Sequence, residues 1–327
     1  MTITAPKSAS KTAAQTLSKI PINKHNGVFV ILAVILLIAA VYSPNFVQPG
    51  NLLTMLRQAS ALGILTVGQL IVIVGGGVDL SVAATMQMAI TIFMYGYNNF
   101  GLPGLAAGLV GAVLFGILAG LANGFLVTRF HVQPFLTTLF TGTIITGLRM
   151  IIAGIKPAGN IPEVIRFFGR DRTLEIPNAL IVFLVVAFVA YLVLDRSVFG
   201  RKLIAVGTNY TAARFSAIQA DWVLIKSYVI CGVLAVLASI ILAGYIGFAD
   251  QWIGEGYSFN SLIAAVIGGN YLGGGRGSVL GVVGGALVMT IVINFVTLLG
   301  FSAPFQHVVS GIVLILALFI GNATARK

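Results

Sequence analysis

The sequence predicts an all-α polytopic membrane protein, and three observations lead to this fold class. Hydrophobic residues make up 58% of the 327-residue chain and charged residues only 8%. The mean hydropathy is +1.03, far outside the range of soluble globular domains. The chain also contains about ten apolar runs close to the length of roughly 20 residues that a helix needs to cross a bilayer.

These apolar runs define the expected helices in chain order. Charged residues, Pro and Gly separate them and mark where each helix should end. Only about two residues separate the eighth run from the ninth, within Gly273–Gly277. The expected spans are 27–43, 58–75, 80–97, 103–128, 133–154, 177–194, 225–246, 258–274, 277–299 and 304–321.

The positions of Lys and Arg predict the orientation of the helices. Residues 1–26 carry four Lys and no acidic residue, and basic segments stay in the cytoplasm. With an even number of spans, both termini share that side. We therefore expect a cytoplasmic tail at 1–26, a single transmembrane domain at 27–321 with a cytoplasmic loop at 195–224, and a cytoplasmic tail at 322–327. The outer loop at 155–177 is an exception, because its four basic residues outnumber its three acidic residues.

Composition and motifs exclude several classes of function. The net charge of +11 comes from basic residues scattered at loop ends, which indicates contact with anionic lipid and not with nucleic acid. Cys231 is the single cysteine and is expected to be a packing residue. His25, His131 and His307 are isolated, and neither Gly-rich run ends in the Gly-Lys-Ser/Thr of a phosphate loop. We expect no catalytic residue, metal or cofactor in this chain, so any ATP would be bound by a partner chain.

An internal repeat relates the two parts of the chain. GGGVDLS at 75–81 has a counterpart in GEGYSFN at 254–260, and Asn, Phe and Pro-Phe recur with nearly equal spacing in 123–135 and 294–305. Glycines also recur every four residues in the fourth and ninth helices, a spacing that lets neighbouring helices approach closely in lipid. The second to fifth helices therefore resemble the seventh to tenth. An offset of five reverses their direction, and such inverted repeats are typical of transporters.

The three glycines Gly75–Gly77 should bend or unwind the chain at a depth where only protein or water can cover the exposed backbone. Asp79 follows them and has two compatible interpretations. In one, Asp79 or Ser81 caps the third helix; in the other, Asp79 faces a path for a polar solute. Other uncharged polar residues inside the spans are expected to form interhelical hydrogen bonds more often than substrate contacts. They are Gln69, Gln87, Asn123, Asn270 and Asn294.

The segment 199–218 in the expected cytoplasmic loop predicts a short helix from about Tyr210 to Ile218. Gly207 and Asn209 precede it and are turn and capping residue types. An amphipathic surface helix is one interpretation of this segment. The other is a docking helix, because small residues would let a partner pack closely against it. These small residues are Ala212, Ala213, Ser216 and Ala217.

Three motifs in this sequence resemble those of the permease subunit of bacterial sugar ABC importers, the group with the ribose, xylose, arabinose and galactoside permeases. They are GGGVDLS from Gly75 to Ser81, the segment from Gly200 through Ala205-Val206-Gly207 to Ala213, and the segment from Ala264 through Gly268-Gly269 to Ser278. With length and helix number, the resemblance covers about 30–321. Its structural glycines are Gly75, Gly76, Gly77, Gly268, Gly269, Gly274 and Gly275.

The resemblance implies that the segment after Gly207 is a coupling helix that docks on a cytoplasmic ATPase, where ATP and Mg²⁺ are bound. It also implies a second permease subunit, identical or different, a periplasmic sugar-binding protein, and a location in the bacterial inner membrane. The residues implied in coupling are Gly207, Asn209, Ala212, Ala213, Ser216, Ala217 and Ile218. We hypothesise that a translocation path lies near Asp79, Phe135, Asn270 and Asn294.

The coupling segment departs from the family pattern at two positions. Related permeases tend to have an acidic residue before the Ala pair and a Gly shortly after it, where this chain has Thr211 and Ala217. Two other classes of protein stay open on sequence alone. An ion-coupled secondary transporter would fit the inverted repeat equally well but should have more buried carboxylates. The other class is a membrane-embedded scaffold or enzyme, but the sequence shows no group of reactive residues that would support an enzyme. The sequence does not identify the sugar.

Overall fold

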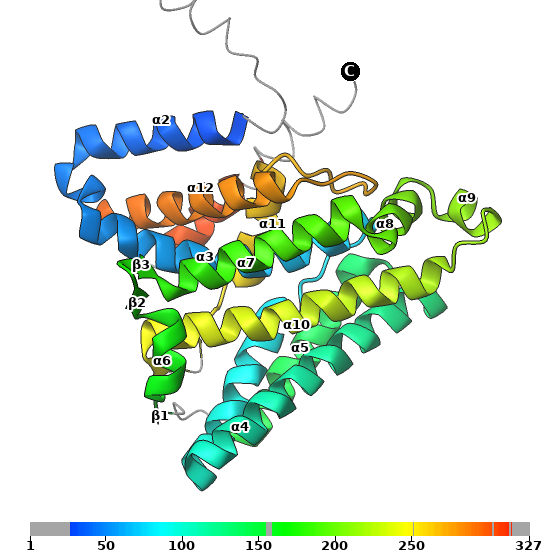
Figure 1. The fold of residues 1–327 in the computed structure, drawn as a ribbon, viewed down its shortest axis with the longest axis horizontal. Coiled ribbons are helices and arrows are strands. Elements are labelled where there is room, and N and C mark those ends of the chain that lie inside the picture. The colour runs from blue at the N-terminus through cyan, green and yellow to red at the C-terminus, as the bar shows by residue number, and fades with distance from the viewer. Residues whose placement is uncertain (1–26, 155–158, 251, 303, 314, 316–327) are drawn as a thin grey trace, which may run out of the picture.

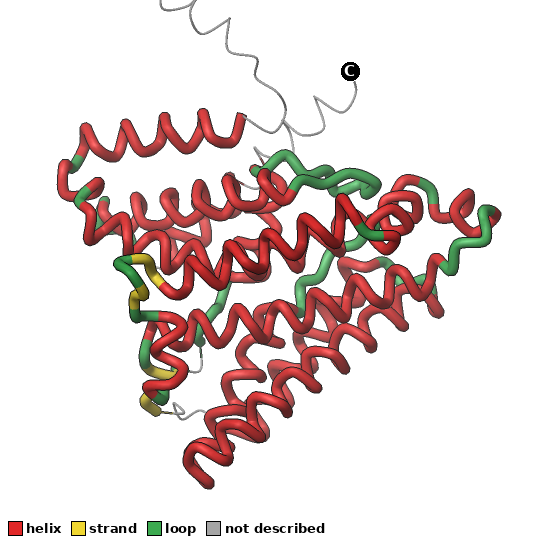
Figure 2. The backbone as a smooth tube through the Cα atoms, viewed as in Figure 1, coloured by secondary structure: helices red, strands yellow, loops and turns green. Residues whose placement is uncertain are grey.

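The protein is described by a computed structural model that covers residues 27–154, 159–250, 252–302, 304–313 and 315 (Figure 1). Helices dominate, and only two small two-stranded sheets occur in the described part of the chain (Figure 2). The helices are α2 Gly27–Tyr42, η1 Pro44–Val47, α3 Pro49–Val74, α4 Val82–Phe130, α5 Pro134–Ala153, α6 Glu163–Gly169, α7 Asn178–Tyr191, η2 Leu192–Arg196, α8 Val198–Thr208, α9 Tyr210–Phe215, α10 Ala220–Ile246, α11 Tyr257–Ile267 and α12 Val279–Leu298. The strands β1 Gly159–Asn160 and β4 Phe248–Ala249 pair with each other, as do β2 Arg172–Thr173 and β3 Ile176–Pro177.

The all-α polytopic fold class is confirmed. Within the described residues, six helices are long and apolar enough to cross a membrane, and α2 and α11 are shorter apolar helices. One of the six, α4, contains two of the predicted spans, 80–97 and 103–128. They are separated by a kink at Gly101, which has non-helical backbone angles. The predicted last span is helical over 304–313, and the two predicted tails lie outside the described residues. The number of ten spans therefore stays a prediction.

The predicted eighth span is too long at its end. We expected a helix over 258–274, but α11 ends at Ile267. Gly269, Gly274 and Gly275 all have positive φ angles, which are incompatible with a continuing right-handed helix. The residues between α11 and α12 form a loop that extends toward α8 (Figure 2). This loop, residues 268–278, is called the glycine loop below.

The equivalent helices of the predicted repeat, α3 and α10, pack against each other in opposite directions. Gln58 near the start of α3 donates a hydrogen bond to the Tyr245 hydroxyl near the end of α10. A Cβ added to Gly75, just after α3, would meet Leu224 near the start of α10. Residue numbers therefore rise along one helix as they fall along the other, which is the direction an inverted repeat requires.

The Gly-rich helices also pack across the two copies of the repeat. Glycines of α4 lie directly against the α10 backbone, so that a Cβ on Gly120 would be 2.4 Å from the Tyr228 carbonyl oxygen. In the second copy, α12 packs on α3, and Asn294 donates a hydrogen bond to Gln58. Each copy therefore packs its Gly-rich helix on the first helix of the other copy. The four-residue spacing of small residues allows the close approach of α4 to α10, whereas Gly281 and Gly285 of α12 lie against the backbone of α11 and the residue that follows it.

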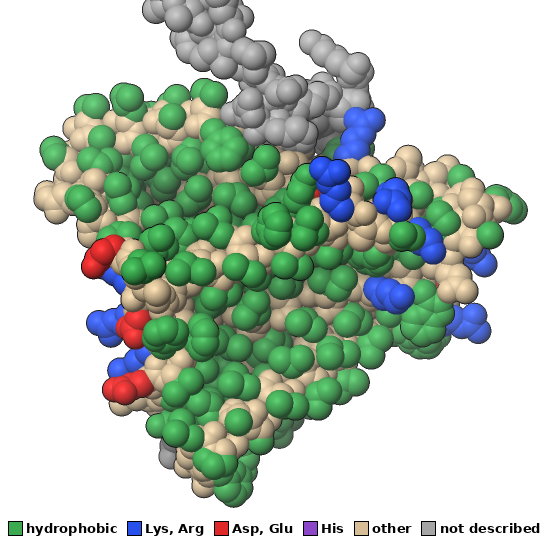
Figure 3. Space-filling view, viewed as in Figure 1, with side chains coloured by type: hydrophobic (Ala, Val, Ile, Leu, Met, Phe, Trp, Pro, Cys, Tyr) green, Lys and Arg blue, Asp and Glu red, His purple; other side chains and the backbone are tan. Residues whose placement is uncertain are grey.

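The surface is apolar between two charged ends. In Figure 3, hydrophobic side chains cover the middle of the visible face, Lys and Arg gather at the end with α8 and α9, and acidic and basic side chains both occur at the end with α6, β2 and β3. This distribution is typical of a membrane protein whose apolar middle lies in the bilayer and whose charged ends lie in water on either side.

Candidate functional site

The first element of the site is the non-helical turn between α3 and α4, Gly75–Ser81, which we call the central turn. Its backbone groups are paired inside the protein. The Gln69 side chain donates to the Asp79 carbonyl oxygen at 2.9 Å and accepts from the Asp79 N–H at 3.1 Å, and Thr138 of α5 accepts from the Leu80 N–H at 3.0 Å. Backbone N–H and C=O groups away from water must be paired in this way. The central turn is therefore held in one conformation by hydrogen bonds to α3 and α5.

Asp79 is 1% exposed and its carboxylate is surrounded by hydrogen-bond donors. Its Oδ1 accepts from the Ser81 N–H at 2.9 Å and from the Ser81 hydroxyl at 2.6 Å. Asn123 of α4 donates to the Ser81 hydroxyl at 2.8 Å and lies 3.4 Å from Asp79 Oδ1. Among the described residues, no Lys, Arg or His nitrogen lies within 4.0 Å of this carboxylate. Hydrogen bonds alone compensate its burial.

The predicted cap is confirmed for Asp79, whose carboxylate accepts from the Ser81 N–H at the start of the predicted helix, and is wrong for Ser81. Ser81 is the N-cap of α4 but makes no side-chain cap bond; its hydroxyl donates to Asp79 and accepts from Asn123. The free N–H of Ala83 instead donates to Ser258 of α11 at 3.2 Å. The Ser258 hydroxyl in turn donates to the Leu80 carbonyl oxygen at 2.7 Å.

Ser258 occupies the repeat position of Asp79, because GEGYSFN aligns with GGGVDLS. This one side chain joins the two halves at equivalent points. Sequence reasoning aligned the two segments but did not identify Ser258 as a functional candidate. The alignment itself was the signal that pointed to it.

Replacing Ser258 with Ala should lower stability, because it leaves the Ala83 N–H and the Leu80 carbonyl without their partner. The loss is about 1 to 3 kcal/mol, which corresponds to a fall of roughly 2 to 6 °C in the Tm of the detergent-solubilised protein. Thr143→Ala is the matched control, because that exposed hydroxyl bonds only to a carbonyl of its own helix. An equal Tm for the two variants would contradict the role of Ser258.

The four residues of the hypothesised path do not all lie together. Phe135 lies one turn before Thr138 and is 41% exposed, so it is close to the central turn. Asn270 is buried at the glycine loop, where it accepts from the Ser278 N–H at 2.7 Å and donates to the Ala265 carbonyl at 2.7 Å. Asn294 contacts Gln58 at the opposite end of α3, about 24 Å along that helix from Val74. A role in substrate contact stays a prediction for all four.

The second element is a contact of three backbone segments, which we call the glycine junction. The Gly275 N–H of the glycine loop donates to the Val74 carbonyl oxygen at the end of α3, at 2.9 Å. Gly207 of α8 lies against both, because a Cβ at this position would be 1.9 Å from the Val74 oxygen and 2.7 Å from the Gly275 nitrogen. The two Gly-rich motifs, one from each half, therefore meet at the segment that precedes α9.

The third element is the coupling segment, which we define as residues 207–218. The predicted short helix is confirmed as α9, although it ends at Phe215. Asn209 caps it, accepting from the Ala212 N–H at 2.9 Å, as its residue type predicted. The predicted coupling residues divide into two groups by exposure: Ala212, Ser216 and Ala217 are exposed, whereas Ala213 is buried and Gly207 and Ile218 are partly buried.

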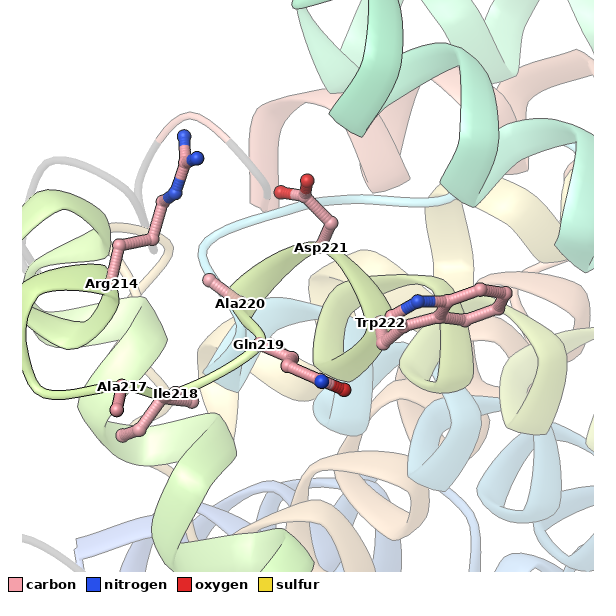
Figure 4. Close-up of a pocket in the computed structure, with 7 residues that line it drawn as sticks. All are labelled: Arg214, Ala217, Ile218, Gln219, Ala220, Asp221 and Trp222. Carbon is pink, nitrogen blue, oxygen red and sulfur yellow. The ribbon is translucent and has the colours of Figure 1, made fainter.

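A surface pocket of about 450 Å³ lies between α9 and the start of α10. Figure 4 shows the Arg214 and Asp221 side chains extending toward the same side of the connecting segment. Two large side chains near it are open to solvent, Phe215 at 89% and Trp222 at 57%. The pocket is lined by Arg214, Ala217, Ile218, Gln219, Ala220, Asp221 and Trp222.

Ala217 has a φ of +58°, in the left-handed region that follows many helices and favours Gly. It is the position at which the resemblance predicted Gly. Ala217→Gly should therefore stabilise the protein by about 1 kcal/mol and raise the Tm by roughly 2 °C, measured on purified protein. The same replacement at exposed Ala212, inside α9, should be destabilising. A lower Tm for Ala217→Gly would show that the left-handed backbone angle of Ala217 does not strain the protein.

Comparisons with known proteins agree over most of the chain. Residues 51–318 match the family described as the branched-chain amino acid transport system permease component. The ribose import permease protein of Bacillus subtilis (strain 168) is 33% identical over 90% of this chain and 91% of its own length. That of Escherichia coli (strain K12) is 32% identical over 89% and 91%, and the D-allose transport system permease protein of the same strain is 30% identical over 92% of both chains. No solved structure matches.

Proposed function

This chain belongs to the permease-component family of ABC importers, and from that premise we propose that it is the membrane subunit through which a monosaccharide or related polyol enters the cell. The observation that carries the proposal is the match over about nine-tenths of the chain to permeases named for ribose and D-allose. A relative named for galactofuranose transport is 32% identical over 89% of this chain. The inverted repeat supports a transport path between the two halves.

In this proposal, ATP and Mg²⁺ are bound by a separate cytoplasmic ATPase subunit, and this chain performs no catalysis. Its own residues transmit movement and form the path. The coupling segment contacts the ATPase, and the glycine junction connects that segment to α3 and to the glycine loop. Because the junction joins backbone to backbone with no intervening side chains, it is stiff. A shift of α8 would therefore move both the end of α3 and the glycine loop, which belong to different halves. A periplasmic sugar-binding protein delivers the substrate, and a second permease subunit completes the path.

The charge distribution of the described residues supports a cytoplasmic position for α8 and α9. At the α8–α9 end, described basic residues outnumber acidic ones; at the α6 end, the two balance, because Asp250 and Glu255 join the acids of the 155–177 loop. Positive-inside then favours the α8–α9 end as cytoplasmic. The charged residues at that end are Arg129, Asp195, Arg196, Arg201, Lys202, Arg214, Asp221, Lys226 and Arg276. Those at the other end are Arg57, Arg149, Glu163, Arg166, Arg170, Asp171, Arg172, Glu175, Asp250 and Glu255.

Radiolabelled sugar uptake into proteoliposomes tests this function. The vesicles would hold this chain with or without a candidate ATPase subunit, ATP and a candidate binding protein. We expect uptake only when all are present, and a panel of pentoses and hexoses would identify the sugar. Uptake by this chain alone, driven by an ion gradient, would overturn the proposal and favour the ion-coupled alternative.

A further inference from the structure

The inference concerns how α9 is attached to the rest of the protein. The helix has only six residues and lies at the edge of the molecule, beyond α8 (Figure 1). Its own burial is limited to Ala213. Its N-terminal residue, Tyr210, is partly buried, and the Tyr210 hydroxyl donates a hydrogen bond to Oδ1 of Asp221. Among the described residues, no other side-chain hydrogen bond connects α9 to α10.

Asp221 is in the first turn of α10, which is the best-connected helix of the fold. α10 belongs to the second copy of the repeat and packs on α4 and α3 of the first copy, as well as on α6 and α8. A carboxylate in the first turn of a helix is favoured by the helix dipole, and a hydrogen bond to a carboxylate is roughly twice as strong as one between neutral groups. The Tyr210–Asp221 bond is therefore a firm attachment at the end of α10 nearest to α9.

One further contact keeps Tyr210 in position. The Arg214 guanidinium lies over the Tyr210 ring at 5.9 Å from its centre, a favourable cation–π distance. Burial, and then the hydrogen bond to Asp221, raises the pKa of Tyr210 above its ordinary value. A phenol donates only while it is protonated, so the raised pKa extends the range in which Tyr210 is a donor to more alkaline pH.

We propose that Tyr210 and Asp221 are positioning residues that make α10 move together with the coupling segment. α9 has two routes to the transmembrane helices. One leads through α8 and the glycine junction, which holds the end of α3. The other leads through Tyr210 and Asp221 to the start of α10. Because α3 and α10 are the equivalent helices of the inverted repeat, the two routes connect the coupling segment to matching helices of both halves. This inference rests on the proposed function.

The test uses the complete transporter, reconstituted with its ATPase subunit and binding protein, and carrying Tyr210→Phe. This variant keeps the aromatic ring and its contact with Arg214 but removes the donor. We expect normal assembly and near-native ATP hydrolysis, with sugar uptake per ATP lowered by about five-fold or more, the low end of typical coupling between sites. Asp221→Asn keeps an oxygen acceptor and should lower uptake per ATP less than Asp221→Ala.

Tyr191→Phe is the matched control, because the Tyr191 hydroxyl also pairs with a charged side chain, accepting from Arg196 five residues along, but joins only the consecutive helices α7 and η2. It should leave uptake per ATP unchanged. The double variant Tyr210→Phe with Asp221→Ala should be no worse than the worse single variant, because the two residues act as a unit.

Three results would overturn the inference: native uptake per ATP in Tyr210→Phe, an equal loss in Tyr191→Phe, or failure of Tyr210→Phe to assemble with the ATPase, which would assign the hydroxyl to docking. Absence of ATP-dependent uptake in the native complex would count against the proposed function instead. The two failures are therefore distinguishable.

Discussion

Gly207→Ala is expected to remove most of the folded protein from the membrane. The added Cβ would be 1.9 Å from the Val74 carbonyl oxygen, and this oxygen is already held by the Gly275 N–H. Both contacts are backbone atoms, so no side chain can rotate away. Overpacking in a close-packed interior costs about 1 to 3 kcal/mol even where side chains adjust, and a rigid backbone contact should cost more. Because total stability is only about 5 to 15 kcal/mol, membrane abundance and the Tm of the purified protein should both fall steeply.

Gly147→Ala is the control for this variant. Gly147 lies in α5, and a Cβ there would meet no atom within 4 Å. Since Ala is the better helix former by up to about 1 kcal/mol, this change should be neutral or slightly stabilising. Native abundance and Tm for Gly207→Ala would show that α8 does not lie against α3 and the glycine loop, and the route through the glycine junction would be wrong.

Asp79→Ala is expected to be the most destabilising change of a polar side chain in the central turn. It removes the acceptor of both the Ser81 N–H and the Ser81 hydroxyl, and also the longer contact with the Asn123 amide, which still has Ser81 as an acceptor. Each buried donor left without a partner costs about 1 to 3 kcal/mol, so a loss of roughly 3 kcal/mol or more is expected. The Tm of the purified protein should fall by at least about 6 °C.

Asp79→Asn separates the structural role of this carboxylate from a role in the path. The Asn side chain keeps an oxygen that can accept from the Ser81 N–H, so its Tm should fall less than that of Asp79→Ala. Because Ser81 and Asn123 already use the carboxylate, we also expect near-native uptake by Asp79→Asn in the reconstituted transporter. Loss of uptake at near-native stability would show instead that the charge itself acts on the substrate path.

The sequence predicted those features of the fold that depend on contiguous residues. The runs of apolar residues identified the membrane helices, and Asn209 identified the start of α9 because capping depends on residues only three positions apart. The repeat of GGGVDLS and GEGYSFN correctly predicted that α3 and α10 run in opposite directions. The prediction failed at 258–274, because hydropathy does not sense that Gly269 and its successors adopt left-handed angles.

The candidate site was only partly predictable, for a reason that the individual residues make clear. Asn270 and Asn294 were grouped as polar residues inside spans, yet they lie near opposite ends of α3, since composition says nothing about which helix ends meet. Ala213 was grouped with its small neighbours as a docking residue, but its side chain is buried within this protein and is not exposed to a partner. Gly207 was identified as a turn residue, whereas its close contacts come from Val74 and Gly275, both distant in sequence.

The sequence by itself determined that this protein is a multi-helix membrane protein with an inverted repeat and a positively charged loop, because hydropathy and charge are sums over neighbouring residues. Only the tertiary structure decided which groups satisfy the buried polar atoms. The Ala83 N–H is paired by Ser258, 175 residues away, and the Gly275 N–H by the Val74 carbonyl. A buried hydrogen bond requires its two atoms to lie within about 3 Å of each other, and that proximity exists only after the two halves have packed.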